Sequence, residues 1–361
     1  MYTLEQYKNR KVLITGHTGF KGSWMCEALL EAGADVTGYA LAPDGSRSLF
    51  QMLSLDKRMK SIEGDIRDLD SLKKAFQKSS PEVVIHMAAQ PIVRESYRNP
   101  VYTYDVNVMG TVNVLECVRQ SKSVKSVVNV TTDKVYKNRE WEWGYRENEE
   151  LNGFDPYSNS KSCSELVTAS YVNSFLKEKG IAVSTMRAGN VIGGGDYAAD
   201  RIIPDCVRAA ESGAEIVIRN PYSIRPYQHV LEPVMAYLMV ADRQLQDPSL
   251  AGSYNVGPEE NDCINTEYIA EEFCRCWKQR TGRNVGIAVQ QDGGPHEAGY
   301  LKLDCSRIRK VFGWEPVWNI EKAIWKSVEL YVDLITGREA LVCMERQIKE
   351  FDGELGNAKF R

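Results

Sequence analysis

The sequence has no paired cysteines and no clustered histidines. Its nine cysteines include no C-x-x-C pair, and its four histidines are far apart, at His17, His86, His229 and His296. No zinc-like spacing is therefore present, and we expect no metal site. An odd number of scattered cysteines, without a recognisable signal peptide, predicts reduced thiols and a cytoplasmic location.

The sequence also lacks an excess of positive charge and long apolar runs. The formal net charge of −4 leaves no basic footprint, so we expect neither nucleic acid nor an anionic membrane as a partner. No apolar run reaches the roughly 20 residues that a membrane-spanning helix needs. Any anionic ligand must instead be bound by a few local arginines. The length of 361 residues predicts two lobes rather than one.

The first half of the chain alternates short β-branched runs with longer amphipathic stretches. Strands are predicted at 12–15, 36–41, 60–62, 83–86, 127–131 and 182–187, and helices at 22–31, 70–77, 103–120 and 158–178. Continuous apolar strands that alternate with helices indicate a parallel sheet covered on both faces. We therefore predict an α/β fold with a doubly wound parallel sheet, of the Rossmann type.

The alternation changes after residue 188. A glycine-rich loop at 189–201 is followed by short mixed elements, with further helices predicted at 232–245, 266–280 and 320–334. We expect residues 1–188, with a returning segment near 228–258, to form a dinucleotide-binding domain. Residues 189–227 and 259–361 would then form a smaller mixed α/β lobe that binds the substrate.

A glycine loop joins the first predicted strand to the first predicted helix. Gly16, Gly19 and Gly22 follow a G-x-x-G-x-x-G pattern, which permits a tight turn, close approach of the backbone to a pyrophosphate, and packing of helix on strand. This spacing resembles the extended short-chain dehydrogenases/reductases. That resemblance implies a carboxylate near the adenine at Asp65, which could alternatively be a helix N-cap or an ordinary loop carboxylate. No arginine pair stands ready for a 2′-phosphate, although Arg47 follows the second strand, and we expect NAD rather than NADP.

A Tyr-x-x-x-Lys pair opens the helix after the fifth predicted strand. Tyr157 and Lys161 lie one helical turn apart, so a nearby cation can lower the phenol pKa and let the phenolate take a hydroxyl proton while hydride leaves the same carbon. Tyr7 and Lys11 have the same spacing but enter the first strand, where no helical pair forms. Position at the carboxyl edge of the sheet therefore selects Tyr157 and Lys161.

Acid–base groups also end the fifth predicted strand, at Thr132, Asp133 and Lys134. An oxidoreductase or epimerase needs only a hydroxyl there. A carboxylic acid and an amine beside the phenol suggest a second chemical event.

The chain resembles the CDP-glucose 4,6-dehydratases over nearly its whole length. The segments that carry the resemblance include GHTGFKGSW (16–24), HMAAQPIVRESY (86–97), TTDKVY (131–136), DPYSNSK (155–161), RAGNVIGGGD (187–196) and RPYQHVLEP (225–233). The resemblance implies that Thr132 binds the sugar 4-hydroxyl, with Tyr157 as base and Lys161 tuning it, and that Asp133 protonates the departing 6-hydroxyl. Lys134 stands where the dTDP-glucose enzymes have a glutamate that acts at C5. Two roles for it stay open, a neutral base or a cation that stabilises the enolate.

The resemblance also implies the ligand contacts. For NAD we expect the residues Gly16, Thr18, Gly19, Phe20, Gly22, Asp65, Ile66, Ala88, Ala89, Gln90, Asn107, Tyr157 and Lys161. For the nucleotide sugar, whose diphosphate suits arginine forks, we expect Arg94, Ser96, Asn190, Arg201, Arg219, Arg225 and His229.

The resemblance implies conversion of CDP-D-glucose to CDP-4-dehydro-6-deoxy-D-glucose and water. The product would feed deoxysugar and cell-surface polysaccharide biosynthesis. We expect the protein to form a homodimer or homotetramer. Two alternatives remain. One is a 4-epimerase, reductase or 4,6-dehydratase of another nucleotide sugar. The other is a non-catalytic dinucleotide sensor, which could dispense with Tyr157, Lys161 and the arginines.

Overall fold

A seven-stranded parallel sheet forms the centre of the protein, seen here in a computed structural model that describes residues 3–43, 45, 47–290 and 299–357. Its strand order is β11-β6-β5-β4-β1-β2-β3, and every neighbouring pair is parallel. The strands are β1 (Lys11–Thr15), β2 (Asp35–Ala40), β3 (Lys60–Glu63), β4 (Val83–His86), β5 (Ser126–Val130), β6 (Ala182–Ala188) and β11 (Ser253–Val256). The predicted doubly wound sheet is confirmed. His296 lies outside the described residues.

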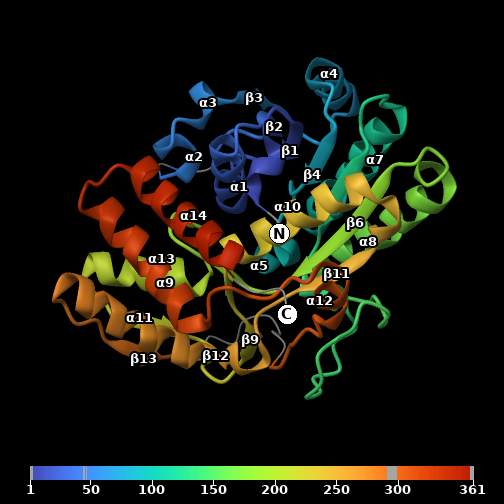
Figure 1. Ribbon diagram of the computed structural model, residues 1–361. Helices are drawn as coiled ribbons and strands as arrows, with labels where there is room; N and C mark the ends of the chain where they lie inside the picture. Colours follow the sequence, from blue (N-terminus) through green and yellow to red (C-terminus); the bar gives the residue numbers. More distant parts are fainter. Residues whose placement is uncertain (1–2, 44, 46, 291–298, 358–361) are drawn as a thin grey trace.

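Helices cover both faces of the sheet (Figure 1). Alternate residues of one strand enter different hydrophobic clusters, Val12 and Ile14 on one face and Leu13 on the other. One face carries α4 (Leu69–Ser79), α7 (Gly110–Gln120) and the end of the helix that begins with α8 (Pro156–Tyr171). The other carries α1 (Phe20–Glu31) and α10 (Leu231–Gln246).

Two predicted helices contain π-helical turns. The predicted helix at 103–120 consists of α6 (Pro100–Tyr104), the π turn η2 (Asp105–Met109) and α7, and α8 continues into the π turn η4 (Val172–Leu176). Short elements fill the remaining connections: η1 (Leu4–Tyr7), α2 (Leu49–Met52), α3 (Leu55–Arg58), α5 (Val93–Arg98) and η3 (Asp133–Val135).

A second hydrophobic cluster lies beyond the carboxyl edge of the sheet. It is built from α9 (Ile202–Ser212), α11 (Thr266–Thr281) and α13 (Ile320–Ile335), together with the parallel strand pair β8 (Ile216–Ile218) and β13 (Ile287–Val289). Two more pairs connect it to the sheet, β7 (Val191–Ile192) with β10 (Gln228–His229), and β9 (Ile224–Pro226) with β12 (Cys263–Asn265). The other elements here are η5 (Pro248–Leu250), η6 (Glu260–Asp262), α12 (Ser306–Phe312) and α14 (Ala340–Asn357).

The chain passes back and forth between these two parts. After β10 it returns to the sheet, where α10 packs on β5 and β6 and β11 pairs with β6, as expected for a segment near 228–258. The last helix, α14, contacts both parts, because it packs against α13 as well as against α1, whose hydrophobic cluster it shares (Figure 1). The domain boundaries themselves stay a prediction. Within the described residues, no helix combines the length and the apolar character that crossing a membrane requires.

Candidate active site

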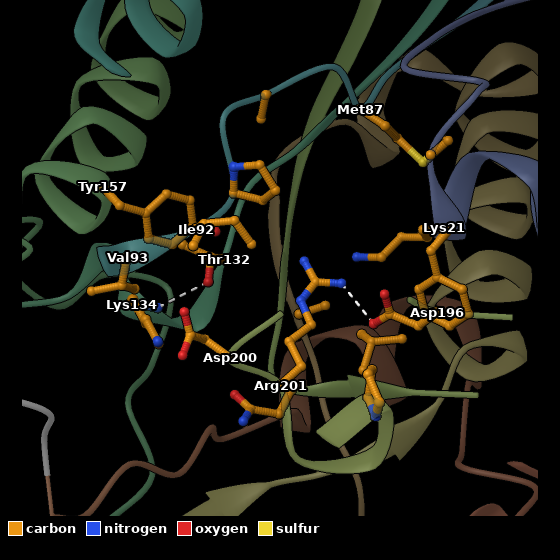
Figure 2. A pocket seen from close by; sticks show the side chains of 18 of the residues that line it. Lys21, Met87, Ile92, Val93, Thr132, Lys134, Tyr157, Asp196, Asp200 and Arg201 are labelled. Carbon is orange, nitrogen blue, oxygen red and sulfur yellow. Dashed lines mark hydrogen bonds and ion pairs between the residues drawn. The ribbon is translucent and has the colours of Figure 1, made fainter. Parts of the chain in front are cut away.

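A cavity of about 670 Å³ lies between the carboxyl edge of the sheet and the second cluster. It is lined by the glycine loop, by the ends of β2, β4, β5 and β6, and by residues of β7, β8 and α9. Figure 2 shows Tyr157, Thr132 and Lys134 on one side of it, and Lys21, Asp196 and Arg201 on the other. Ligands of open α/β sheets bind at this edge.

The glycine loop has the geometry that its spacing predicts. Gly16 has a φ of +79°, and a Cβ there would lie 2.7 Å from the Ala88 nitrogen. A Cβ on Gly22 would lie 2.2 Å from the Gly16 oxygen. Gly19 is the N-cap of α1, so the first turn of that helix points its N–H groups and its partial positive charge at the cavity. A side chain at Gly16 or Gly22 would collide with this backbone, so only glycine allows the loop to turn so tightly before α1.

Most of the expected cofactor residues line the cavity: Gly16, Thr18, Gly19, Phe20, Gly22, Asp65, Ile66, Ala88, Ala89, Tyr157 and Lys161. Asp65 is not a helix cap, because Asp68 caps α4 through the Ser71 nitrogen at 3.0 Å. Asp65 instead pairs with Arg67 at 2.6 Å, which lowers the pKa of its carboxyl.

Gln90 and Asn107 lie outside the cavity lining, behind the loop that follows β4. The Gln90 nitrogen donates to the Asn107 side-chain oxygen at 2.8 Å, and the Asn107 amide donates to Ser160 on α8 at 2.9 Å. Both side chains are buried. Their contacts fix this loop against the helix that carries Tyr157, so they position the site rather than line it.

The Tyr157–Lys161 pair comes from the start of α8, which Asp155 caps and Pro156 opens. Burial raises the pKa of Tyr157 to about 12, against the lowering contributions of the Thr132 hydroxyl and the Arg201 cation. Burial also lowers the pKa of Lys161 to about 8, and the Lys161 ammonium donates to the Val130 carbonyl at 3.2 Å. The expectation that a neighbouring cation lowers the phenol pKa is therefore wrong for this structure, because burial outweighs it.

Thr132, Asp133 and Lys134 follow β5 at the same edge. Thr132 donates to Asp133 Oδ1 at 2.9 Å, whereas Asp133 Oδ2 is buried and has no hydrogen-bond partner among the described residues. Burial raises the Asp133 pKa, opposed by Lys134, the Thr132 hydroxyl and Arg225. The half-buried Lys134 side chain reaches toward Asp200 in Figure 2. Burial thus makes this carboxyl hold a proton more tightly than an exposed aspartate would, and among the described residues no partner competes with a ligand for its Oδ2.

A buried ion pair that the sequence reasoning missed supports this edge. Arg187 on β6 contacts Glu165 on α8 at 2.9 Å, and both side chains are almost fully buried. Glu165 also accepts from Thr131 at 2.6 Å and from Thr185 at 2.7 Å. The pair ties the end of β5 to α8 one turn after Lys161. Its signal in the sequence is only a charged residue within a strand and another within a helix.

The expected substrate residues divide into two groups. Arg94, Asn190, Arg201, Arg219 and Arg225 line the cavity. Three of these arginines contact carboxylates of the loop between β7 and α9: Arg201 contacts Asp196 at 2.7 Å, and Asp200 is contacted by Arg219 at 2.8 Å and by Arg94 at 3.8 Å.

Ser96 and His229 lie away from the cavity lining. Ser96 is buried and donates to the Val93 carbonyl at 2.6 Å. The His229 ring is fully buried between Trp24 and Trp318, with centroids 5.7 and 4.8 Å away, and burial lowers its pKa to about 3. Neither residue is placed to touch a substrate, because packing within the fold encloses both side chains.

Comparisons with known proteins agree with this geometry. A family model described as GDP-mannose 4,6 dehydratase matches residues 13–326. A CDP-glucose 4,6-dehydratase of Salmonella typhimurium is 46% identical over 351 residues, which cover 96% of this chain and 97% of that protein. A putative UDP-glucose 4-epimerase of Methanocaldococcus jannaschii is 34% identical, with 88% and 97% covered.

Solved structures share the fold at low sequence identity. The dTDP-glucose 4,6-dehydratase of Bacillus anthracis in complex with NAD superposes with a TM-score of 0.75 at 22% identity, covering 92% of this chain and 99% of that one. The family model and the curated relatives extend over most of the chain. The protein therefore belongs to the GDP-mannose 4,6 dehydratase family of extended short-chain dehydrogenases/reductases.

Proposed function

We propose that the protein is an NAD-dependent CDP-glucose 4,6-dehydratase, which converts CDP-D-glucose to CDP-4-dehydro-6-deoxy-D-glucose and water. The observation that carries the reaction type is the buried Asp133 carboxyl, which lies beside Thr132 and within electrostatic reach of the Tyr157 phenol, with Oδ2 unpartnered and its pKa raised. A protonated carboxyl supplies the acid that water loss requires. The assignment of CDP as the nucleotide of the substrate rests on the Salmonella relative alone.

The residues fit a bound dinucleotide. Gly16 and Gly22 allow the tight loop that brings the N-terminus of α1 to the cavity, where it can face a pyrophosphate, and Tyr157 and Lys161 line the same cavity. Arg47, which follows β2, is paired with Glu211 at 2.8 Å and would have to give up this ion pair to bind a 2′-phosphate, which favours NAD over NADP. When bound, NAD takes up a hydride from sugar C4 and later returns it to C6.

The chain's own residues move the protons. Tyr157 accepts the proton of the 4-hydroxyl, which Thr132 holds, as the C4–H bond breaks. The resulting ketone acidifies the C5 proton, which a base removes. Asp133 then gives its proton to the 6-hydroxyl, the C6–O bond breaks and water leaves. As hydride returns to C6, a proton from the base or from solvent is added at C5, so one water is lost and no net oxidation occurs.

Lys134 has two possible roles in the C5 step. A neutral amine would take the C5 proton, whereas an ammonium would stabilise the enolate oxygen. Lys134→Met removes both functions and Lys134→Arg keeps only the positive charge. Dehydration activity in Lys134→Arg but not in Lys134→Met supports the electrostatic role of Lys134. Loss of dehydration activity in both variants supports its role as the base.

A 4-epimerase is the second candidate, favoured by the Methanocaldococcus relative and by the shared fold. An epimerase needs no acid at C6, so Asp133 distinguishes the two. In Asp133→Asn we expect hydride transfer to NAD to continue while water loss slows by about 10²–10⁴-fold. Reduced cofactor should then accumulate after mixing with CDP-glucose, measured by stopped-flow absorbance.

The wild-type protein and Asp133→Asn should be compared in heavy water. The wild type should form the 4-keto product with deuterium at C5. Formation of CDP-galactose without deuterium at C5 would contradict the proposed dehydratase activity and support an epimerase. Water loss at the wild-type rate in Asp133→Asn would show that Asp133 is not the acid.

We also propose a homo-oligomer that works in the cytoplasm. Exposed apolar side chains lie on the mutually packed α6, η2 and α8, at Val101, Met109 and Leu166, and a second copy would cover them. All nine cysteines are free, which suits a reducing compartment. Light scattering of the purified protein tests the assembly, and a monomer at micromolar concentration would overturn it.

A further inference from the structure

Lys21 carries a charge that the proposed reaction does not use. It is the second residue of α1, within the glycine loop, and its side chain lines the cavity. In Figure 2 its ammonium points from the loop toward Arg201, across the space that faces Tyr157. Among the described residues no carboxylate forms an ion pair with it.

The surroundings of Lys21 make this unpaired cation unfavourable. Burial, together with the positive charges of Arg201 and Lys161, lowers its pKa to about 7, and Asp133 acts in the opposite direction. The nearest aromatic wall is Tyr237, whose ring centroid is 5.5 Å from the Lys21 ammonium. The Tyr237 hydroxyl is also buried and has no hydrogen-bond partner among the described residues. A half-buried ammonium and a buried, unpartnered hydroxyl therefore lie at the same wall.

An unpaired cation in such a place weakens the fold unless a ligand neutralises it. Arg201 is paired with Asp196 at 2.7 Å. Lys21, in contrast, has no carboxylate partner among the described residues on this side of the cavity. The N-terminus of α1, one turn from the lysine, adds N–H donors and a partial positive charge. An anionic ligand oxygen is the group that satisfies all of these features.

We propose that Lys21 is a diphosphate-binding residue, whose ammonium pairs with a phosphate oxygen of a ligand held in the cavity. The inference rests on the proposed function, because both the dinucleotide and the nucleotide sugar bring a diphosphate to this cavity. A lysine acts on phosphate as a flexible point charge, while the helix N-terminus supplies directed hydrogen bonds. The residue thus adds a side-chain contact to a loop whose glycines provide only backbone.

Binding titrations of the full-length protein with NAD and, separately, with CDP test the proposal. In Lys21→Met, which keeps length and removes charge, we expect about 10–100-fold weaker binding of NAD, CDP or both, as for loss of one hydrogen bond to a charged group. Lys21→Arg should recover most of the affinity, and high salt should narrow the gap between wild type and Lys21→Met. Lys122→Met removes an exposed lysine and serves as the control for net charge.

The thermal midpoint of the ligand-free protein separates binding from structure. Because Lys21→Met deletes an unpaired charge, we expect its midpoint to equal or exceed that of the wild type. Wild-type affinity for both ligands in Lys21→Met would overturn the proposal. A thermal midpoint of Lys21→Met clearly below that of the wild type would also overturn it, because weaker binding would then reflect a damaged fold. Failure of the wild type itself to bind either ligand would overturn the proposed function instead, so the two failures are distinguishable.

Discussion

Glu232→Gln should make the protein more stable in alkaline solution. Glu232 lies on α10 in the segment RPYQHVLEP, and its side chain is fully buried. One carboxylate oxygen accepts from the backbone nitrogens of Val317 at 2.9 Å and Trp318 at 2.7 Å, while the other has no partner among the described residues. Burial raises the Glu232 pKa to about 8, although the two backbone donors oppose this.

The sign and size of the effect follow from the two protonation states. A carboxyl with a raised pKa in the folded state binds its proton more tightly there, so stability falls as the pH rises from the unfolded pKa toward the folded one. Raising the pKa from 4.5 to about 8 corresponds to about 5 kcal/mol at full ionisation, at about 1.36 kcal/mol per pKa unit. About 3 kcal/mol of that is lost between about pH 6 and about pH 9.

Glutamine resembles the protonated carboxyl and cannot ionise. The difference in unfolding free energy between Glu232→Gln and the wild type should therefore grow by about 3 kcal/mol between about pH 6 and about pH 9, in favour of the variant. Urea titrations at both pH values, with thermal midpoints as a second measure, provide the test. Glu63→Gln, at an exposed position on β3, is the matched control. A difference that stays constant with pH would refute the reasoning.

Three further variants test the site and its support. Tyr157→Phe should lower the rate of hydride transfer by about 10²–10⁴-fold with CDP affinity unchanged; single-turnover absorbance checks this, and a wild-type rate would contradict it. Asp200→Asn should tighten CDP binding, because the carboxylate that holds Arg219 at 2.8 Å competes with a ligand phosphate; calorimetry showing weaker binding would contradict it. Arg187→Met should lower the unfolding free energy by about 3–5 kcal/mol by leaving Glu165 charged and buried; a urea midpoint like that of the wild type would contradict it.

The elements that create the sheet edge could be predicted from the sequence. Val83–His86 was predicted with its observed bounds, and the other strands of the first half differ by one or two residues at most, because β-branched runs between turns have few alternatives. The strand pairs β7–β10 and β9–β12 were not predicted, since strands of two or three residues carry no periodicity. The last helix, α14, was expected in the second lobe, and its packing against α1 in addition to α13 was not predicted.

Side-chain environments were harder to predict than positions. His229 was expected to touch substrate because a polar residue in a motif suggests function, yet Trp24 and Trp318, far away in sequence, enclose it. The phenol pKa was predicted from the neighbouring lysine, whereas burial decides its direction. Lys21 was quoted within the glycine loop without a role, because the sequence does not show that its charge lacks a partner. In each case contacts distant in the chain set the result.

The shared fold does not separate dehydration from epimerisation. Epimerases and dehydratases both superpose on this chain, with TM-scores of 0.77 for the UDP-glucose 4-epimerase of Thermotoga maritima and 0.75 for the Bacillus anthracis dehydratase. In the proposed reaction, Tyr157 and Lys161 would serve the oxidation at C4, which a common scaffold can supply. The proposed acid for water loss, Asp133, lies at the end of β5, where burial raises its pKa and Thr132 donates to it. Under this proposal, the choice between the two reactions depends on one strand end rather than on the sheet that presents it.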